Sequence, residues 1–126
     1  MKQSELMWLA GLLEGEGCFH NRSERYFSPL IQLIMTDADV VIRAAKAMNA
    51  HKVVRGKQDS RGGKPLFRVN VYGTTAANLM QKLLPHMGER RSNKIKEILD
   101  ARASRPRSPY PERKSYSRGA KIIWSR

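Results

Sequence analysis

Residues 9–17 read LAGLLEGEG, an apolar run that ends in two carboxylates, Glu14 and Glu16, separated by one glycine. Leucines at positions 6, 9, 12 and 13 recur at helical spacing, and Ser4 is an N-cap residue type, so we predict a helix that begins near Ser4. Ala10 and Gly11 carry almost no side chain, so the backbone of a second helix can approach closely at that turn. The pattern predicts a helix that packs against another of its kind.

The glycines at the end of this run predict where the helix stops. Gly15 and Gly17 permit the chain to turn there, which leaves Glu16 projecting from the C-terminal end of the helix. A carboxylate at a helix C-terminus is opposed by the helix dipole, which favours cations at that end. A bound divalent metal would remove this conflict. The alternative to metal binding for such an acid-glycine repeat is a helix end with two solvated glutamates.

Composition indicates a polyanionic partner. The chain has 126 residues, enough for one domain, and its 24 basic and 11 acidic residues give a net charge of +13. We favour nucleic acid over a membrane, because no apolar run reaches the length of a spanning helix and the basic residues are scattered along the chain. An RNA-binding protein would show the same charge. The single cysteine, Cys18, excludes an internal disulfide, and the first residues lack a secretory signal, so we expect an intracellular protein.

Hydrophobic periodicity predicts four strands and four helices along residues 1–104. The strands alternate apolar and polar residues, and the helices carry apolar stripes bounded by caps and by proline or glycine. A polar turn at residues 23–25 and a glycine-rich loop at residues 59–65 join the strands of each pair. The predicted strands are residues 18–22, 27–35, 51–58 and 66–72, and the predicted helices are residues 4–16, 37–48, 75–84 and 92–103.

This order, α-β-β-α-β-β-α-α, predicts an α+β domain with helices on one face of a four-stranded antiparallel sheet. Residues 1–104 form the predicted domain. Residues 105–126 are rich in proline and carry seven basic residues and one acidic residue, so we read them as a basic arm. With DNA present, this arm would lie along phosphates and residues 122–124 would anchor its end. A solvated tail is the alternative.

A sheet with helices on one face leaves the other face open for a ligand. Strand alternation predicts polar and cationic side chains there, of the types that read major-groove base edges and contact phosphates. Each of them alone is also compatible with an ordinary solvated strand position. The predicted DNA-binding residues are His20, Arg22, Gln32, Arg55, Lys57, Arg68 and Asn70.

Residues 9–17 resemble the signature of the LAGLIDADG homing endonucleases. Five of the nine positions are identical to that signature, and the other four are like-for-like changes, with glutamate in place of both aspartates. The resemblance covers residues 4–103, strongly at the signature and weakly elsewhere, and implies the same element order. Chains of this family with a single motif look like homodimers. The resemblance therefore also implies self-association through the motif helix, and hence a nearly palindromic target. The implied dimer-interface residues are Leu9, Ala10, Leu12 and Leu13.

The resemblance further implies the chemistry of a nuclease. Glu16 takes the position of the family's metal-binding acid and the Gly15 carbonyl that of its backbone ligand, which suits Mg²⁺. Asp37, Arg90 and Arg91 fall near positions where the family places catalytic polar and cationic groups. Asp37 is equally compatible with a helix N-cap, and the two arginines with a solvated or phosphate-binding pair. The glutamates keep the carboxylates but lengthen each side chain by one methylene, so cleavage follows less directly than binding.

Three functions are compatible with these observations. The leading expectation is a site-specific, Mg²⁺-dependent endonuclease that cuts both strands of double-stranded DNA as a homodimer. The first alternative is a non-cleaving nucleic-acid binder of the same fold, such as an RNA maturase or a DNA-binding regulator. The second alternative, a basic ribosome-associated module, explains the charge but not residues 9–17, and it predicts a monomer.

Overall fold

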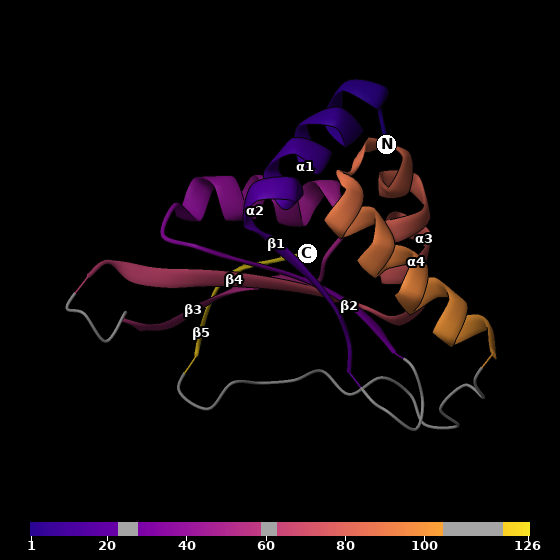
Figure 1. Cartoon of the computed structure of the whole chain (residues 1–126). Helices are drawn as coiled ribbons and strands as arrows, with labels where there is room; N and C mark the ends of the chain where they lie inside the picture. The colour runs from indigo at the N-terminus through magenta and orange to yellow at the C-terminus, as the bar shows by residue number, and fades with distance from the viewer. Residues whose placement is uncertain (23–27, 59–62, 105–119) are drawn as a thin grey trace.

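A computed structural model of the chain describes residues 1–22, 28–58, 63–104 and 120–126. The predicted turn at residues 23–25, most of the predicted loop at residues 59–65 and the first fifteen residues of the predicted arm lie outside the described residues. Figure 1 shows the helices gathered on one face of a twisted sheet, with the other face free of helices. The elements are α1 (Gln3–Glu16), β1 (Gly17–Asn21), β2 (Pro29–Met35), α2 (Ala38–Ala47), β3 (Lys52–Gln58), β4 (Pro65–Tyr72), α3 (Gly73–Leu83), the 3-10 turn η1 (Leu84–His86), α4 (Glu89–Ser104) and β5 (Lys121–Ser125).

The sheet confirms the predicted α+β class and extends it by one strand. Its strand order is β1-β2-β4-β3-β5, and every neighbouring pair is antiparallel. The four strands predicted from periodicity occupy the first four places in this order. The fifth, β5, comes from the end of the predicted arm and pairs with β3 at the edge of the sheet.

The core lies between the helices and one face of the sheet. Ile31 and Leu33 of β2 are fully buried, as are Leu9 and Leu13 of α1, while Val69 of β4 is 1% exposed. Successive strand side chains point to opposite faces, so these alternate positions all point toward the helices. The apolar alternation of the sequence therefore decides which face the helices cover.

Side-chain contacts hold the C-terminal half of strand β5 and the residue that follows it. Trp124 lies opposite the buried Val53 of β3. The side chains of Ile123 and Trp124 both pack against the core. The Arg126 guanidinium donates to the backbone and side-chain oxygens of Asn49. Asn49 has a φ of 57°, the left-handed conformation that ends α2. Residues 121–125, at the end of the predicted arm, thus form an edge strand of the sheet, and Ile123 and Trp124 pack against the core.

The four α-helices of the described chain begin one to three residues away from their predicted starts, and the differences at α1 and α4 concern predicted first residues or caps. Helix α1 begins at Gln3 with Lys2 at the N-cap position, so Ser4 lies inside the first turn and does not cap the helix. Helix α4 begins at Glu89, three residues before the predicted start at Ser92. In the parts of the chain that the structure describes, no helix is both long and apolar enough to cross a membrane.

Candidate functional site

Helix α1 passes directly into β1, and at Gly17, where they meet, there is no space for a side chain. The helix ends at Glu16 and the strand begins at Gly17, with no loop between them. A Cβ at Gly17 would lie 2.7 Å from Leu13 Cδ2 and 2.9 Å from the Leu13 carbonyl oxygen. The φ of Gly17 is −83°, which any residue adopts, so close approach and not backbone freedom explains the glycine. Glu16 is therefore the last residue of α1 and directly precedes the first residue of β1.

Glu14 contacts the start of α4 and is not a free carboxylate. Its two oxygens accept the Gly88 backbone N–H at 3.2 and 3.3 Å. The Gly88 carbonyl accepts the Ser92 N–H at 2.8 Å, so Gly88 occupies the N-cap position of α4. A carboxylate at a helix N-terminus satisfies an orphan donor and interacts favourably with the helix dipole. This contact joins residues 74 positions apart, which explains why sequence reasoning missed both the contact and the start of α4.

Arg91 of α4 makes a second connection to the same junction. Its Nη1 donates to the Gly17 carbonyl, and its guanidinium carbon lies 6.0 Å from the centre of the Phe19 ring. The Nε of Arg91 is buried and has no hydrogen-bond partner within the described residues. Arg90, in contrast, is exposed and makes no hydrogen bond or ion pair with them. The structure therefore brings Arg91, but not Arg90, against the end of the motif.

Glu16 is the open acid of the motif. Its side chain is exposed and makes no hydrogen bond or ion pair with the described residues. Asp37 occupies the N-cap position of α2, is exposed and makes no side-chain capping bond. Because Gly17 lies opposite Leu33, Asp37 follows β2 at the same end of the sheet as Glu16. Over the described ranges, no three His, Cys, Asp or Glu side chains form a metal-binding group.

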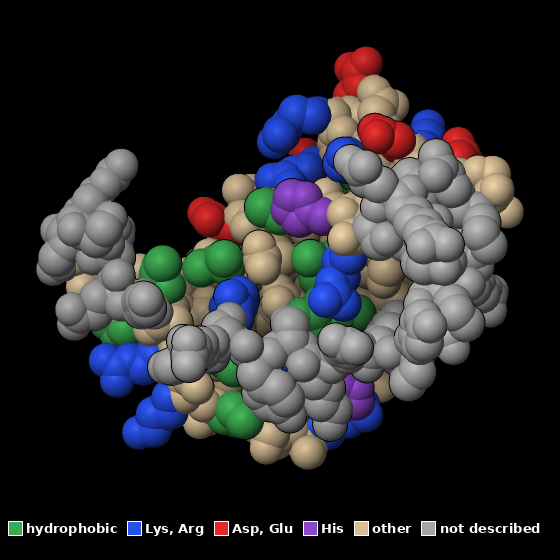
Figure 2. Space-filling view, turned by 90° about the horizontal axis from the view of Figure 1, so that it is seen from below, with side chains coloured by type: hydrophobic (Ala, Val, Ile, Leu, Met, Phe, Trp, Pro, Cys, Tyr) green, Lys and Arg blue, Asp and Glu red, His purple; other side chains and the backbone are tan. Residues whose placement is uncertain are grey.

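The open face of the sheet carries both polar and apolar rows of side chains. The strand register aligns one polar row, Cys18, Gln32 and Asn70, across β1, β2 and β4. Figure 2 shows this face from below, with hydrophobic side chains between Lys and Arg side chains and acidic side chains toward its rim. The neighbouring row is Ile34, Arg68, Val54 and Ile122, and a third row is His20, Leu30 and Tyr72.

Tyr72 connects two of the predicted DNA-binding residues at this face. Its hydroxyl accepts the Asn70 side-chain amide at 2.9 Å, and the guanidinium carbon of Arg22 lies 4.4 Å from its ring centre. The sequence analysis did not single out Tyr72, although its position in the β4 alternation places it on the face of Asn70. Ile34 and Ile122 were also missed, with exposed fractions of 40% and 49%.

Two of the predicted DNA-binding residues need separate description. Arg55 is exposed, but the register pairs it with Phe67, whose side chain packs on the helix side of the sheet. Opposed residues of antiparallel strands share a face, so Arg55 does not lie in the open-face rows. Alternation from the buried Val53 also places Arg55 on the helix side, so its predicted place on the open face is wrong, and the register shift of β3 begins only after Arg55. The side chain of Lys57 lies outside the described part of the chain.

The exposed side of α1 differs from the predicted dimer interface. Leu9 and Leu13 are fully buried and Ala10 is 2% exposed, so these side chains belong to the core of the protomer itself. Leu12 is half-buried and packs against the same core. The outward side of the helix instead presents Gly11 and Gly15, and a Cβ at either would meet nothing within 4 Å. Together with Met7, 48% exposed, these glycines form what we call the outer face of α1.

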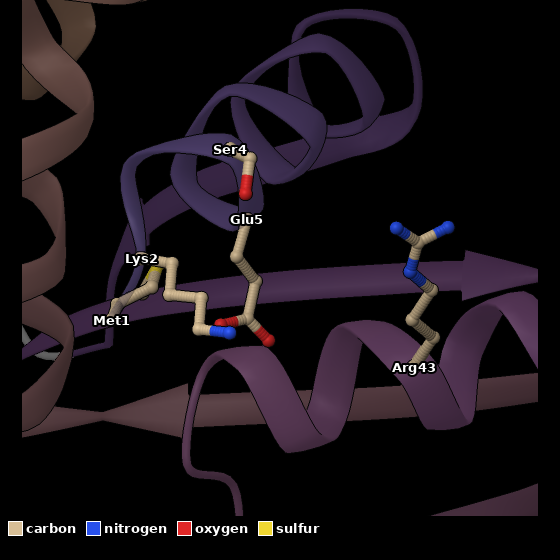
Figure 3. Close-up of a pocket in the computed structure, with 5 residues that line it drawn as sticks. All are labelled: Met1, Lys2, Ser4, Glu5 and Arg43. Atoms are coloured by element: carbon tan, nitrogen blue, oxygen red, sulfur yellow. The ribbon is translucent and has the colours of Figure 1, made fainter.

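A polar pocket lies on the helix side, away from the open face. Its lining residues are Met1, Lys2, Ser4, Glu5 and Arg43, from the start of α1 and from α2 (Figure 3). Lys2 and Glu5 extend toward each other there, and Arg43 lies apart on α2. The guanidinium carbon of Arg43 lies 3.9 Å from the centre of the Trp8 ring. The pocket includes none of the predicted site residues.

Comparison with known proteins identifies the fold. No protein-family model matches the sequence, and no curated protein matches it. Two solved structures of the homing endonuclease I-CvuI are similar, one with Mg²⁺ and uncleaved DNA and one with its DNA target and Ca²⁺. Each is 20% identical to this chain over 78% of its residues, with TM-scores of 0.58 and 0.59. An archaeal intron-encoded homing endonuclease complexed with DNA is 11% identical over 79% of the chain, with a TM-score of 0.57.

These similarities show that the chain has the fold of the LAGLIDADG homing endonucleases. The chain covers 65% of the length of I-CvuI and 69% of the archaeal enzyme. At these identities the similarity concerns the fold alone.

The Glu14 contact at Gly88 predicts a specific coupling. A Cβ at Gly88 would lie 2.5 Å from Glu14 Oε1, so Gly88→Ala displaces the carboxylate and removes its hydrogen bonds. We expect Gly88→Ala to lower the free energy of unfolding by about 1 kcal/mol in the wild type and by a few tenths at most in Glu14→Ala. Urea denaturation of the four proteins of this cycle measures the coupling. Gly88→Ala combined with Glu97→Ala, an exposed acid of α4, should instead be additive.

Proposed function

We propose that this protein is a site-specific DNA endonuclease that acts as a homodimer and cuts both strands of a nearly palindromic site. The observation that carries the proposal is the exposed Glu16 carboxylate at the α1-β1 junction. It makes no hydrogen bond or ion pair with the described residues, and it lies beside a sheet whose open face carries side chains of the types that contact base edges. The fold similarity supports it, because the similar proteins are homing endonucleases described in complex with DNA.

The Gly15–Glu16 segment would hold a divalent metal. The carboxylate and the backbone carbonyl are hard oxygen donors of the kind that Mg²⁺ prefers, and the exposure of both residues leaves them accessible. When bound, Mg²⁺ would polarise the scissile phosphate and lower the pKa of an attacking water. Glu16 would orient that centre from the end of α1, and the Arg91 side chain would add positive charge beside the Gly17 carbonyl. Asp37 and Arg90 remain candidates for contacts to water or phosphate.

A dimer would complete the site. The outer face of α1 has two glycines four residues apart, which allow two helix backbones to approach closely. Pairing of two outer faces about a two-fold axis brings two α1 ends together, and with them two Glu16 carboxylates. Like charges at short range repel each other, so divalent metal would favour the pairing. Leu12 would border this contact, whereas Leu9, Ala10 and Leu13 would support it from inside the protomer.

The open face would recognise the DNA. A net charge of +13 favours the phosphate backbone through counterion release, independently of sequence. Sequence reading would fall to the polar row, where Gln32 has an amide that fits the adenine edge, and to Ile34, which can contact a thymine methyl group. His20, Arg22, Arg68 and Asn70 would add contacts from the same face. Arg55 and Lys57 remain candidates for phosphate contacts.

Removal of the Glu16 carboxylate tests the chemistry. We expect Glu16→Gln to lower cleavage about 10²–10³-fold, because a neutral amide is a poor metal ligand. The DNA affinity should stay within about twofold of the wild type. Both proteins are incubated with a randomised plasmid library and Mg²⁺, and the ends are sequenced, with Ca²⁺ as a non-supporting metal and Glu97→Gln as the control variant. DNA binding by the wild type without discrete ends in any metal would favour the non-cleaving binder.

A bulky residue at Gly11 tests the dimer. We expect Gly11→Leu to weaken self-association about 100-fold or more, because the new side chain separates the two helices. The monomer should be as stable as the wild type or more so, since glycine costs about 1 kcal/mol within a helix. Sedimentation and thermal unfolding measure the two effects, with Lys96→Leu on α4 as the control. Unchanged association in Gly11→Leu would exclude this face as the interface.

A change of amide to acid at Gln32 tests the recognition. We expect the wild type to enrich a DNA motif with adenine at a fixed position in each half-site. Gln32→Glu should change that position to cytosine, whose amino group donates to a carboxylate, with at least about tenfold altered preference. Selection from a random DNA library in Ca²⁺ provides the readout, and Gln81→Glu on α3 is the control. An enriched motif identical in all three proteins would contradict the assignment of Gln32.

A further inference from the structure

Two contacts from α4 enclose the last turn of α1. Glu14 accepts the Gly88 N–H on one side of that turn, and the Gly17 carbonyl accepts the Arg91 guanidinium on the other. Gly15 and Glu16 lie between these two fixed points in the chain. A Cβ at Gly15 would touch nothing within 4 Å, so no side-chain packing holds this segment from outside. The Gly17 N–H also donates to the Leu13 carbonyl as the last hydrogen bond of α1, and the two contacts from Gly88 and Arg91 add restraint from outside this helix.

The chemistry of the two contacts is reciprocal. An acid of α1 binds the positive N-terminal end of α4, while a base of α4 binds a carbonyl that follows the end of α1, where the helix is negative. Each interaction involves a charged group and is stronger than a neutral hydrogen bond. The Phe19 ring below the Arg91 guanidinium limits its freedom, because it contributes a cation-π contact at 6.0 Å.

We propose that Glu14 and Arg91 are positioning residues that fix the Gly15 carbonyl and the Glu16 carboxylate for metal binding. Glu14 therefore has a different role from Glu16, although the two acids are separated by one residue. Glu14 is occupied by Gly88, whereas Glu16 has no partner within the described chain. The metal-binding part of this inference rests on the proposed function, and the structural part, that the two contacts restrain the turn, does not.

Amide hydrogen exchange of the full-length protein tests the structural part without DNA or metal. We expect Glu14→Gln and Arg91→Met each to reduce protection of the Glu16 and Gly17 amides at least about tenfold, with protection in β2 and β4 unchanged. Arg91→Lys keeps a charged donor and should restore part of the protection. The controls Glu97→Gln and Lys96→Met change exposed residues of the same helix and should show wild-type exchange. Unchanged protection at Glu16 and Gly17, or an equal loss throughout the sheet, would overturn the inference.

The metal requirement of cleavage tests the second part. We expect Glu14→Gln to raise the Mg²⁺ concentration for half-maximal cleavage about tenfold while DNA affinity without divalent metal changes less than twofold, since outer residues that orient metal ligands have effects of about 10–100-fold. A merely destabilised protein would lose DNA affinity and cleavage together at all Mg²⁺ concentrations. A wild-type metal requirement in Glu14→Gln would overturn the metal-binding part. If the wild type fails to cleave but the exchange results hold, the proposed function fails and the restraint of the turn stands.

Discussion

The close packing at Gly17 is the constraint on which the functional geometry depends. The chain passes from α1 into β1 without a loop, and Leu13 leaves no room for a side chain at Gly17, the first residue of the strand. One residue, Glu16, is therefore the last of the helix and the neighbour of the first strand. Its place relative to the open face follows from the sheet register, and its place relative to the outer face of α1 follows from the helix. A loop at this junction would separate these two relationships, and the carboxylate could not serve both.

The sequence predicts elements that rest on local periodicity and misses those that rest on distant contacts. The element order over residues 1–104 follows from alternation in β2 and β4 and from the apolar stripes of the helices. The start of α4 does not, because its cap is a carboxylate 74 residues earlier in the chain. Strand β5 was read as an arm, since five residues at the end of a basic, proline-rich segment give no signal until β3 offers them an edge.

The sequence predicted the residue types of the candidate site better than the face on which each side chain lies. The motif identified Glu16, and alternation placed Gln32, Arg68 and Asn70 on the open face. Arg55 is two residues from the core residue Val53 and pairs with Phe67, so the two-residue period itself places it on the helix side and not on the open face, where it was predicted. The motif leucines were expected between protomers, yet the helix needs Leu9 and Leu13 for its own sheet. The surface of α1 is divided, because its large apolar residues face the sheet and its glycines face outward.

The difference between the two acids of the motif follows from what lies opposite each of them. Glu14 points to a helix N-terminus, where a carboxylate stabilises the start of α4. The stability of the fold is therefore a sufficient reason for an acid at position 14. Glu16 lies at a helix C-terminus and within the described residues has no donor, so folding alone gives no reason for an acid there. In a chain with a net charge of +13, an unpaired carboxylate also opposes binding to phosphates. In the proposed function, a cation held between that carboxylate and the DNA would turn both disadvantages into attractive interactions, which is the physical reason to propose the chemistry at Glu16 and not at Glu14.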